Sequence, residues 1–199
     1  AKDSLYIFVE TTASIADANP TDFLYTDQIR FGTDTDYQKV ELVTLIQDAI
    51  FLYPQKFEDG TTETITLGSG ENAQDIYGFY LDENDPVHGN EYHLTNEKPY
   101  VIYGYAGVAS GKTLTIDAGA RLHFHADSGL IVANGATLKV NGAPSVTPAM
   151  ENEVVFEGDR LEPGFADVPG QWGTVWITSG STGHSINHLT LKNSVVGLL

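Results

Sequence analysis

Apolar side chains recur every eight residues in the second half of the chain. At each step a leucine is followed two positions later by another apolar residue, which gives the pairs Leu114/Ile116, Leu122/Phe124, Leu130/Val132 and Leu138/Val140. An apolar residue at every second position is typical of a short β-strand with one buried face. The count continues at Val154 and Phe156, after a segment whose two prolines suit a loop or an edge strand.

Short segments rich in Gly, Asn and Asp separate these strands, and such residues accept the positive φ angles of tight bends. They read DAG at 117–119, ADSG at 126–129, ANG at 133–135 and NGA at 141–143. Three sides of eight residues make a lap of 24, and GKTLTID at 111–117 returns as GATLKVN at 135–141. Stacked laps predict a parallel β-solenoid. An antiparallel sandwich of regular hairpins is the alternative, although hairpins do not require a repeat of a whole lap.

The pattern is interrupted at 157–171 and then resumes. The interruption holds two prolines and three glycines and predicts a loop. The strand WGTVWI follows, with Val175 and Ile177 expected to face inward. The last residues read VVGLL without a polar cap, so we expect the natural protein to continue past Leu199 or another chain to cover this open end by end-to-end self-association.

Residues 1–98 show a different pattern. Seven short β-prone stretches are separated by turn-forming clusters such as GTDTD and DENDPVHGN, spaced about 8–15 residues apart. This spacing predicts an antiparallel β-sandwich, immunoglobulin-like in shape. The segment at 40–50 fits a helix tolerably, but its Val, Thr and Ile residues favour strand, which is our prediction. The sequence therefore predicts an all-β chain with a sandwich domain at 1–98 and an incomplete β-helix domain at 99–199.

Charge and composition narrow the range of partners. The formal net charge is −17, with 27 acidic against 10 basic side chains. Nucleic acid is not expected as a partner, because phosphate contacts need Lys and Arg to displace counterions, and polyanionic sugars and anionic membranes are disfavoured likewise. The chain has no cysteine, hence no disulfides or thiolate metal sites. No apolar run of about 18 residues predicts a membrane-spanning segment.

The second half also resembles a known group of proteins. The stretches LTIDAGARLHFHADSGLIVANGATLKVNGAP, VVFEGDR and PGQWGTVWI are similar to Bacteroidetes cell-surface proteins, many of them lipoproteins, in which a right-handed parallel β-helix follows a β-sandwich-like region. The likeness covers roughly residues 101–199, and GQWGTVWI is its most specific part. It implies export and a lipid anchor upstream of residue 1. It supplies an architectural pattern and no catalytic residues.

Aromatic side chains are the candidate ligand-binding residues. Trp176 is expected to face outward because Val175 and Ile177 face inward, and Tyr103 and Tyr105 lie near the expected domain junction. Exposed aromatic rings bind sugars by stacking on their apolar faces. The alternative is that these rings pack the sandwich against the β-helix.

His123 and His125 are the candidate metal ligands. They flank Phe124 and are expected to point outward from one face, at a spacing that lets two side chains hold one zinc or copper ion. The alternative is two exposed polar residues, and the pair His184/His188 is expected to be structural. Carboxylates cluster in the loops 32–36 and 82–89, where calcium is compatible but not specified, and solvated turns are the alternative. No cofactor is predicted.

These features favour a non-catalytic, secreted or cell-surface protein that serves adhesion or binds a glycan or another surface protein. Residues 101–199 contain four Asp and two Arg without a repeated acidic pair, and no nucleophile, zinc-protease or phosphate-loop motif occurs. Two alternatives stay open. The chain is the N-terminal part of a polysaccharide-degrading β-helix protein with catalytic coils beyond Leu199, or it is a structural spacer.

Overall fold

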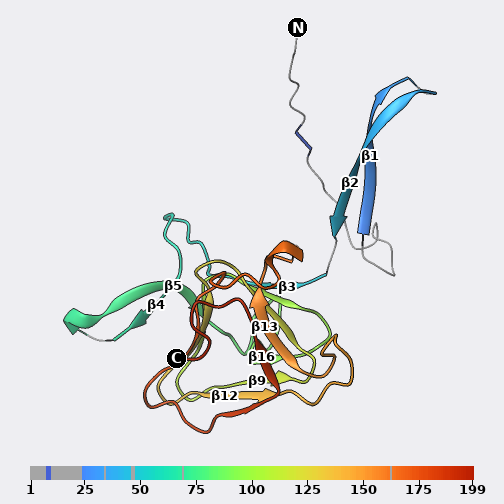
Figure 1. Cartoon of the computed structure of the whole chain (residues 1–199). Coiled ribbons are helices and arrows are strands. Elements are labelled where there is room, and N and C mark those ends of the chain that lie inside the picture. Colours follow the sequence, from blue (N-terminus) through green and yellow to red (C-terminus); the bar gives the residue numbers. More distant parts are fainter. Residues whose placement is uncertain (1–7, 10–23, 34, 46–47, 69, 162) are drawn as a thin grey trace. The chain divides into compact units, whose positions relative to one another are not determined.

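The chain is all-β in the part that the computed structural model describes, which comprises residues 8–9, 24–33, 35–45, 48–68, 70–161 and 163–199 (Figure 1). Two single turns of 3-10 helix, η2 (Gly70–Asn72) and η3 (Pro163–Phe165), interrupt the strands. The chain divides into two units, Ala1–Asp48 and Ala49–Leu199.

The first unit contains a β-hairpin. Strand β1 (Leu24–Gly32) pairs in antiparallel register with β2 (Tyr37–Leu45), from Leu24 opposite Leu45 to Gly32 opposite Tyr37. The prediction of strand rather than helix for 40–50 is confirmed, since β2 covers its first half and β3 (Ile50–Leu52) begins at its end. The expected strand at 4–10 lies mostly outside the described residues.

The second unit is built from three sheets whose strands run parallel to their neighbours, except for β4 (Thr64–Leu67), which is antiparallel to β5 (Gln74–Tyr80). Sheet 1 has the order β16-β13-β10-β7-β3, sheet 2 the order β14-β11-β8-β5-β4, and sheet 3 the order β15-β12-β9-β6. The remaining bounds are β6 (His93–Leu94), β7 (Tyr100–Ile102), β8 (Tyr105–Val108), β9 (Thr113–Asp117), β10 (Arg121–Phe124), β11 (Gly129–Val132), β12 (Thr137–Asn141), β13 (Val154–Gly158), β14 (Val175–Ile177), β15 (Ser185–Asn187) and β16 (Leu189–Leu191).

The chain visits the three sheets in a fixed order, lap after lap. Strands β7, β8 and β9 add one strand to each sheet, and β10, β11 and β12 add the next. The 24-residue repeat is confirmed, because Leu114 of β9 pairs with Leu138 of β12, and Ile116 pairs with Val140. All strands between Tyr100 and Leu191 pair in parallel, as stacked laps require and the hairpin alternative does not.

The expected apolar columns form the core between the three sheets. The residues of the eight-residue count are all buried there, namely Leu114, Ile116, Leu122, Phe124, Leu130, Val132, Leu138, Val140, Val154 and Phe156. The corners use the predicted turn residues, since Gly119 and Gly135 adopt φ angles of 82° and 75° and Asp127 one of 58°. Repetition in the sequence thus becomes repetition in packing.

The predicted domain boundary at 98/99 is wrong. The division falls after Asp48, and residues 49–98, which we expected in the sandwich, supply the first lap. Their strands β3, β5 and β6 pair in parallel with β7, β8 and β9. The cause is that two excursions, 53–73 and 81–92, separate the strands of this lap. Excursions rich in turn residues destroy the 24-residue period and imitate the spacing of a sandwich.

The later laps tolerate a similar excursion. The expected loop at 157–171 carries η3, and the chain returns at Trp172, a buried residue whose ring stacks on Phe124 with 4.3 Å between ring centroids. Parallel bridges from Trp172 to Ser194 and from Val175 to Leu198 continue the winding beyond β16. Within the described residues, no helix is long and apolar enough to cross a membrane.

Candidate functional site

The largest groove among the described pockets lies on the first lap and has a volume of about 690 Å³. One side carries aromatic rings, because strand alternation turns Phe51 and Tyr80 outward when Leu52 and Phe79 point into the core. Phe51, Tyr53 and Tyr80 are 46%, 63% and 43% exposed. Its polar residues are Gln55, Lys56, Glu63, Asp82, Asp85, His88 and Glu91. The groove thus combines open apolar rings with hydrogen-bonding groups.

The polar side of the groove is the loop between β5 and β6. Asp85 and Gly89 exchange two backbone hydrogen bonds of 2.9 Å each, which closes a tight turn at its tip. At its base, the Asp82 N–H donates to Glu91 Oε2 at 2.9 Å, and the Glu91 N–H donates to the Asp82 carbonyl at 2.9 Å. The loop therefore holds its shape through its own main chain.

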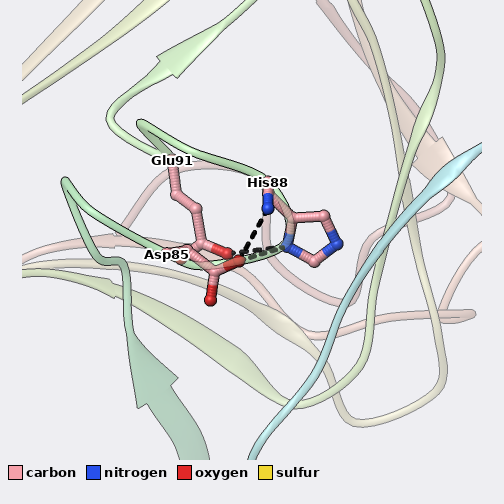
Figure 2. A group of neighbouring side chains, drawn as sticks. All are labelled: Asp85, His88 and Glu91. Atoms are coloured by element: carbon pink, nitrogen blue, oxygen red, sulfur yellow. Dashed lines mark hydrogen bonds and ion pairs between the residues drawn. The ribbon is translucent and has the colours of Figure 1, made fainter.

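Inside this turn, two carboxylates converge on one imidazole (Figure 2). His88 Nδ1 lies 3.0 Å from Glu91 Oε1 and 3.3 Å from Asp85 Oδ1. Glu91 is buried, with 7% of its surface exposed, and the side chains of His88 and Asp85 are about three-quarters buried. The three ligand atoms all lie within 4.8 Å of one another.

The turn holds Asp85 in its charged form. The backbone N–H groups of His88 and Val87 donate to Asp85 Oδ1 at 2.7 and 2.8 Å, and the bond from His88 is the main cause that lowers the pKa of this carboxyl. An ionised carboxylate fixed in this way serves as an acceptor or a metal ligand. It does not serve as a general acid, which must hold its proton.

The predicted aromatic ligand residues do not share one site. Tyr105 lines a cavity of about 320 Å³ whose lining includes Tyr77 and Trp172 but neither Tyr103 nor Trp176. Its ring packs on backbone, since a Cβ on Gly129 would lie 2.6 Å from Tyr105 Cε1, and burial raises the pKa of its hydroxyl.

The other two predicted aromatic residues occupy separate places. The ring of Tyr103 stacks on His125 with 4.5 Å between centroids. Trp176 is half-buried and pairs with Ile131 across sheet 2, while Val175 and Ile177 pack into the core as predicted.

The predicted metal ligands His123 and His125 each meet a carboxylate of the following lap. His125 Nδ1 lies 2.6 Å from Asp159 Oδ2, and His123 Nδ1 lies 3.7 Å from Glu157 Oε1. We expected both rings to be exposed, but His123 is covered, its Nδ1 has no hydrogen-bond partner, and burial lowers the pKa of its imidazole. Among the described residues, neither belongs to a group of three metal-ligating side chains.

The histidine pair His184/His188 is structural, as expected. His184 Nδ1 accepts a hydrogen bond of 3.0 Å from the Leu138 N–H, which ties one lap to the next. His188 sits at a bend with a φ angle of 45°. Of the two acidic loops, 32–36 contains a residue outside the described part of the chain, and 82–89 supplies two members of the group in Figure 2.

The sequence carries a signal for this group that the predicted sites do not include. Asp85, His88 and Glu91 follow one another at intervals of three residues. The predicted calcium loop ends at position 89 and considers only oxygen ligands, so it misses Glu91 and the imidazole. The exposed rings Phe51 and Tyr53 are missed because the predicted sandwich places them on its strands.

Comparison of the chain with protein-family models, with curated proteins and with solved structures found no match.

Proposed function

We propose that this protein is a non-catalytic, cell-surface binding protein that holds a neutral glycan in the groove of the first lap. The observation that carries the proposal is the row of exposed rings, Phe51, Tyr53 and Tyr80, beside hydrogen-bonding side chains. Sugar rings have apolar faces that stack on aromatic rings and hydroxyl edges that need polar partners. A groove with both kinds of surface fits such a ligand, and the underlying laps, which we take to form a right-handed parallel β-helix, would hold it rigidly.

The charge of the groove supports a neutral ligand. Four carboxylates, Glu63, Asp82, Asp85 and Glu91, line it against the basic side chains of Lys56 and His88. The whole chain carries a net charge of −17, so a uronate or sulfated sugar would be repelled both locally and at long range.

The engagement of the carboxylates supports binding without catalysis. Asp85 accepts two backbone hydrogen bonds, and Glu91 accepts one while facing His88. Hydrolysis of a glycosidic bond needs a carboxylic acid that keeps its proton and a second carboxylate free to attack or to activate water. Carboxylates that build a turn are committed to structure. The cell-surface location rests on the resemblance to Bacteroidetes surface proteins, and surface labelling of intact cells would test it.

A glycan array with the full chain tests the proposal, followed by titration of the best neutral oligosaccharide. We expect Tyr53→Ala and Tyr80→Ala each to weaken binding about tenfold, the equivalent of about 1.4 kcal/mol of lost stacking. Tyr77→Ala is the matched control, because Tyr77 is 50% exposed on the same strand as Tyr80 but lines a different cavity.

Three outcomes would overturn the proposal. Equal losses in all three variants would mean that the groove is not the site. Shortening of the oligosaccharide during incubation would identify a hydrolase instead. Absence of binding to any sugar would favour a protein partner or a structural spacer.

A further inference from the structure

We propose that Asp85, His88 and Glu91 form a binding site for a zinc-class transition-metal ion. A metal site goes beyond the proposed glycan binding and does not depend on it, since a metal can brace this loop without any sugar. The site lies on the loop between β5 and β6 and shares the wall of the groove (Figure 2).

The spacing of the ligand atoms matches tetrahedral coordination. For zinc with bonds of about 2.0–2.1 Å to nitrogen and oxygen, the edges of a tetrahedron are about 3.3–3.4 Å long. His88 Nδ1 lies 3.0 Å from Glu91 Oε1 and 3.3 Å from Asp85 Oδ1, and the two carboxylate ligand atoms lie within 4.8 Å of each other. Three protein ligands leave a fourth position for water or for a ligand in the groove.

The kinds of donor atom select the metal. Calcium and magnesium take oxygen ligands, usually six or more, whereas one imidazole nitrogen with two carboxylates suits zinc and its neighbours. Calcium, which the sequence allowed for this loop, therefore does not fit the set that the fold brings together. The chain has no cysteine, so no thiolate site competes for the ion.

A hydrogen bond from His88 does not by itself account for the group. One Nδ1–H can donate one good bond, yet two carboxylate oxygens face this nitrogen. The ion pairs that the structure describes for Asp85 and Glu91 are both with His88. Burying a carboxylate such as Glu91 beside a second one is unfavourable, because like charges repel and water is excluded. A divalent cation between them removes both penalties.

The loop also supplies the outer contacts that metal ligands need. The N–H groups of Val87 and His88 orient the Asp85 carboxylate, and the N–H of Asp82 orients the Glu91 carboxylate through its other oxygen. Hydrogen bonds of this kind fix the direction of ligating carboxylates and strengthen metal binding. The group is thus arranged before an ion arrives.

Titration of the full chain, first stripped of metal by chelator and dialysis, tests the site with Zn²⁺ as the probe. We expect one equivalent to bind, with Ca²⁺ and Mg²⁺ failing to compete, and cobalt to give the visible absorption of a tetrahedral ion. Since a ligand that binds only the folded state stabilises it, Zn²⁺ at a hundred times its Kd should raise the ratio of folded to unfolded protein about 100-fold.

Three variants decide whether these residues hold the ion. His88→Ala should lose binding at least tenfold, and Asp85→Asn should weaken it as well while keeping an oxygen that accepts the two backbone hydrogen bonds of the turn. His125→Ala is the matched control, because His125 also contacts a carboxylate, at 2.6 Å, but lacks a third ligand. Tyr53→Ala should bind zinc normally, which separates this test from the glycan test.

Unchanged zinc affinity in His88→Ala would overturn the proposal. So would an equal loss in His125→Ala, or displacement of zinc by calcium.

Discussion

Leu138 provides the sharpest test of the stacked laps. Its side chain is fully buried, and its strand pairs in register with β9, so that Leu138 lies one lap beyond Leu114, which is also fully buried. The next residue, Lys139, is exposed on the same strand. Replacing Leu138 by alanine therefore removes core, whereas replacing Lys139 by alanine removes surface.

The expected cost follows from the atoms that are lost. Leu138→Ala removes three carbon atoms from the core, worth about 2.4 kcal/mol at about 0.8 kcal/mol each. A cavity adds to this, because laps that are hydrogen-bonded on both sides collapse little, so we expect a total of about 3–4 kcal/mol, within the range of about 2–5 for buried leucines. Lys139→Ala should change the free energy of unfolding by no more than about 0.5 kcal/mol.

Urea unfolding of the full chain measures both values. The double variant Leu114→Ala/Leu138→Ala sharpens the test, since side chains in contact couple by about 0.5–3 kcal/mol whereas distant ones add. Equal losses for Leu138→Ala and Lys139→Ala, or strict additivity of the two leucine substitutions, would refute the stacking of one lap on the next.

Three further predictions concern the turns and loops. The Thr147 hydroxyl and the Val146 N–H hold the pKa of Glu151 at about 2, below its usual 4.5, so its contribution to stability is complete above pH 4.5 and is lost as the pH falls toward 2; Glu151→Gln should flatten this part of the unfolding profile, and an unchanged profile would contradict the assignment. Gly129→Ala would place a Cβ 2.2 Å from the Thr174 carbonyl oxygen and should cost about 1–3 kcal/mol of unfolding free energy, whereas Gly164→Ala, with nothing within 4 Å, should be neutral; equal melting temperatures would count against the packing. The Arg121 guanidinium donates to the carbonyls of Ala149, Met150 and Glu153, so Arg121→Ala should speed proteolysis of the 144–153 loop, and an unaltered cleavage rate would show that the loop is held by other contacts.

The sequence alone predicted the regular laps correctly. Each apolar pair such as Leu114/Ile116 reports a buried strand face locally, and the distance of 24 residues to Leu138/Val140 reports which strands become neighbours. A repeat makes long-range pairing readable because every lap must match the one before it. The inward direction of Val175 followed from the same alternation.

The first lap could not be found in this way. Strands β3, β5 and β6 are separated by the excursions 53–73 and 81–92, and no periodicity connects them. What places them is hydrogen bonding to β7, β8 and β9, a contact between segments whose spacing in sequence is irregular. Local patterns therefore suggested a separate sandwich where the tertiary structure continues the same winding.

The sequence by itself determined that the chain is all-β, that its second half winds in laps of 24 residues and which side chains fill those laps, because these properties depend on short-range alternation. Only the tertiary structure decided where the functional groups meet. The turn between β5 and β6 folds back on itself and brings His88 onto two carboxylates, and strand β3 sets Phe51 and Tyr53 beside them. The physical reason is that a site needs atoms a few ångströms apart in space, and the folding of irregular loops alone creates that proximity.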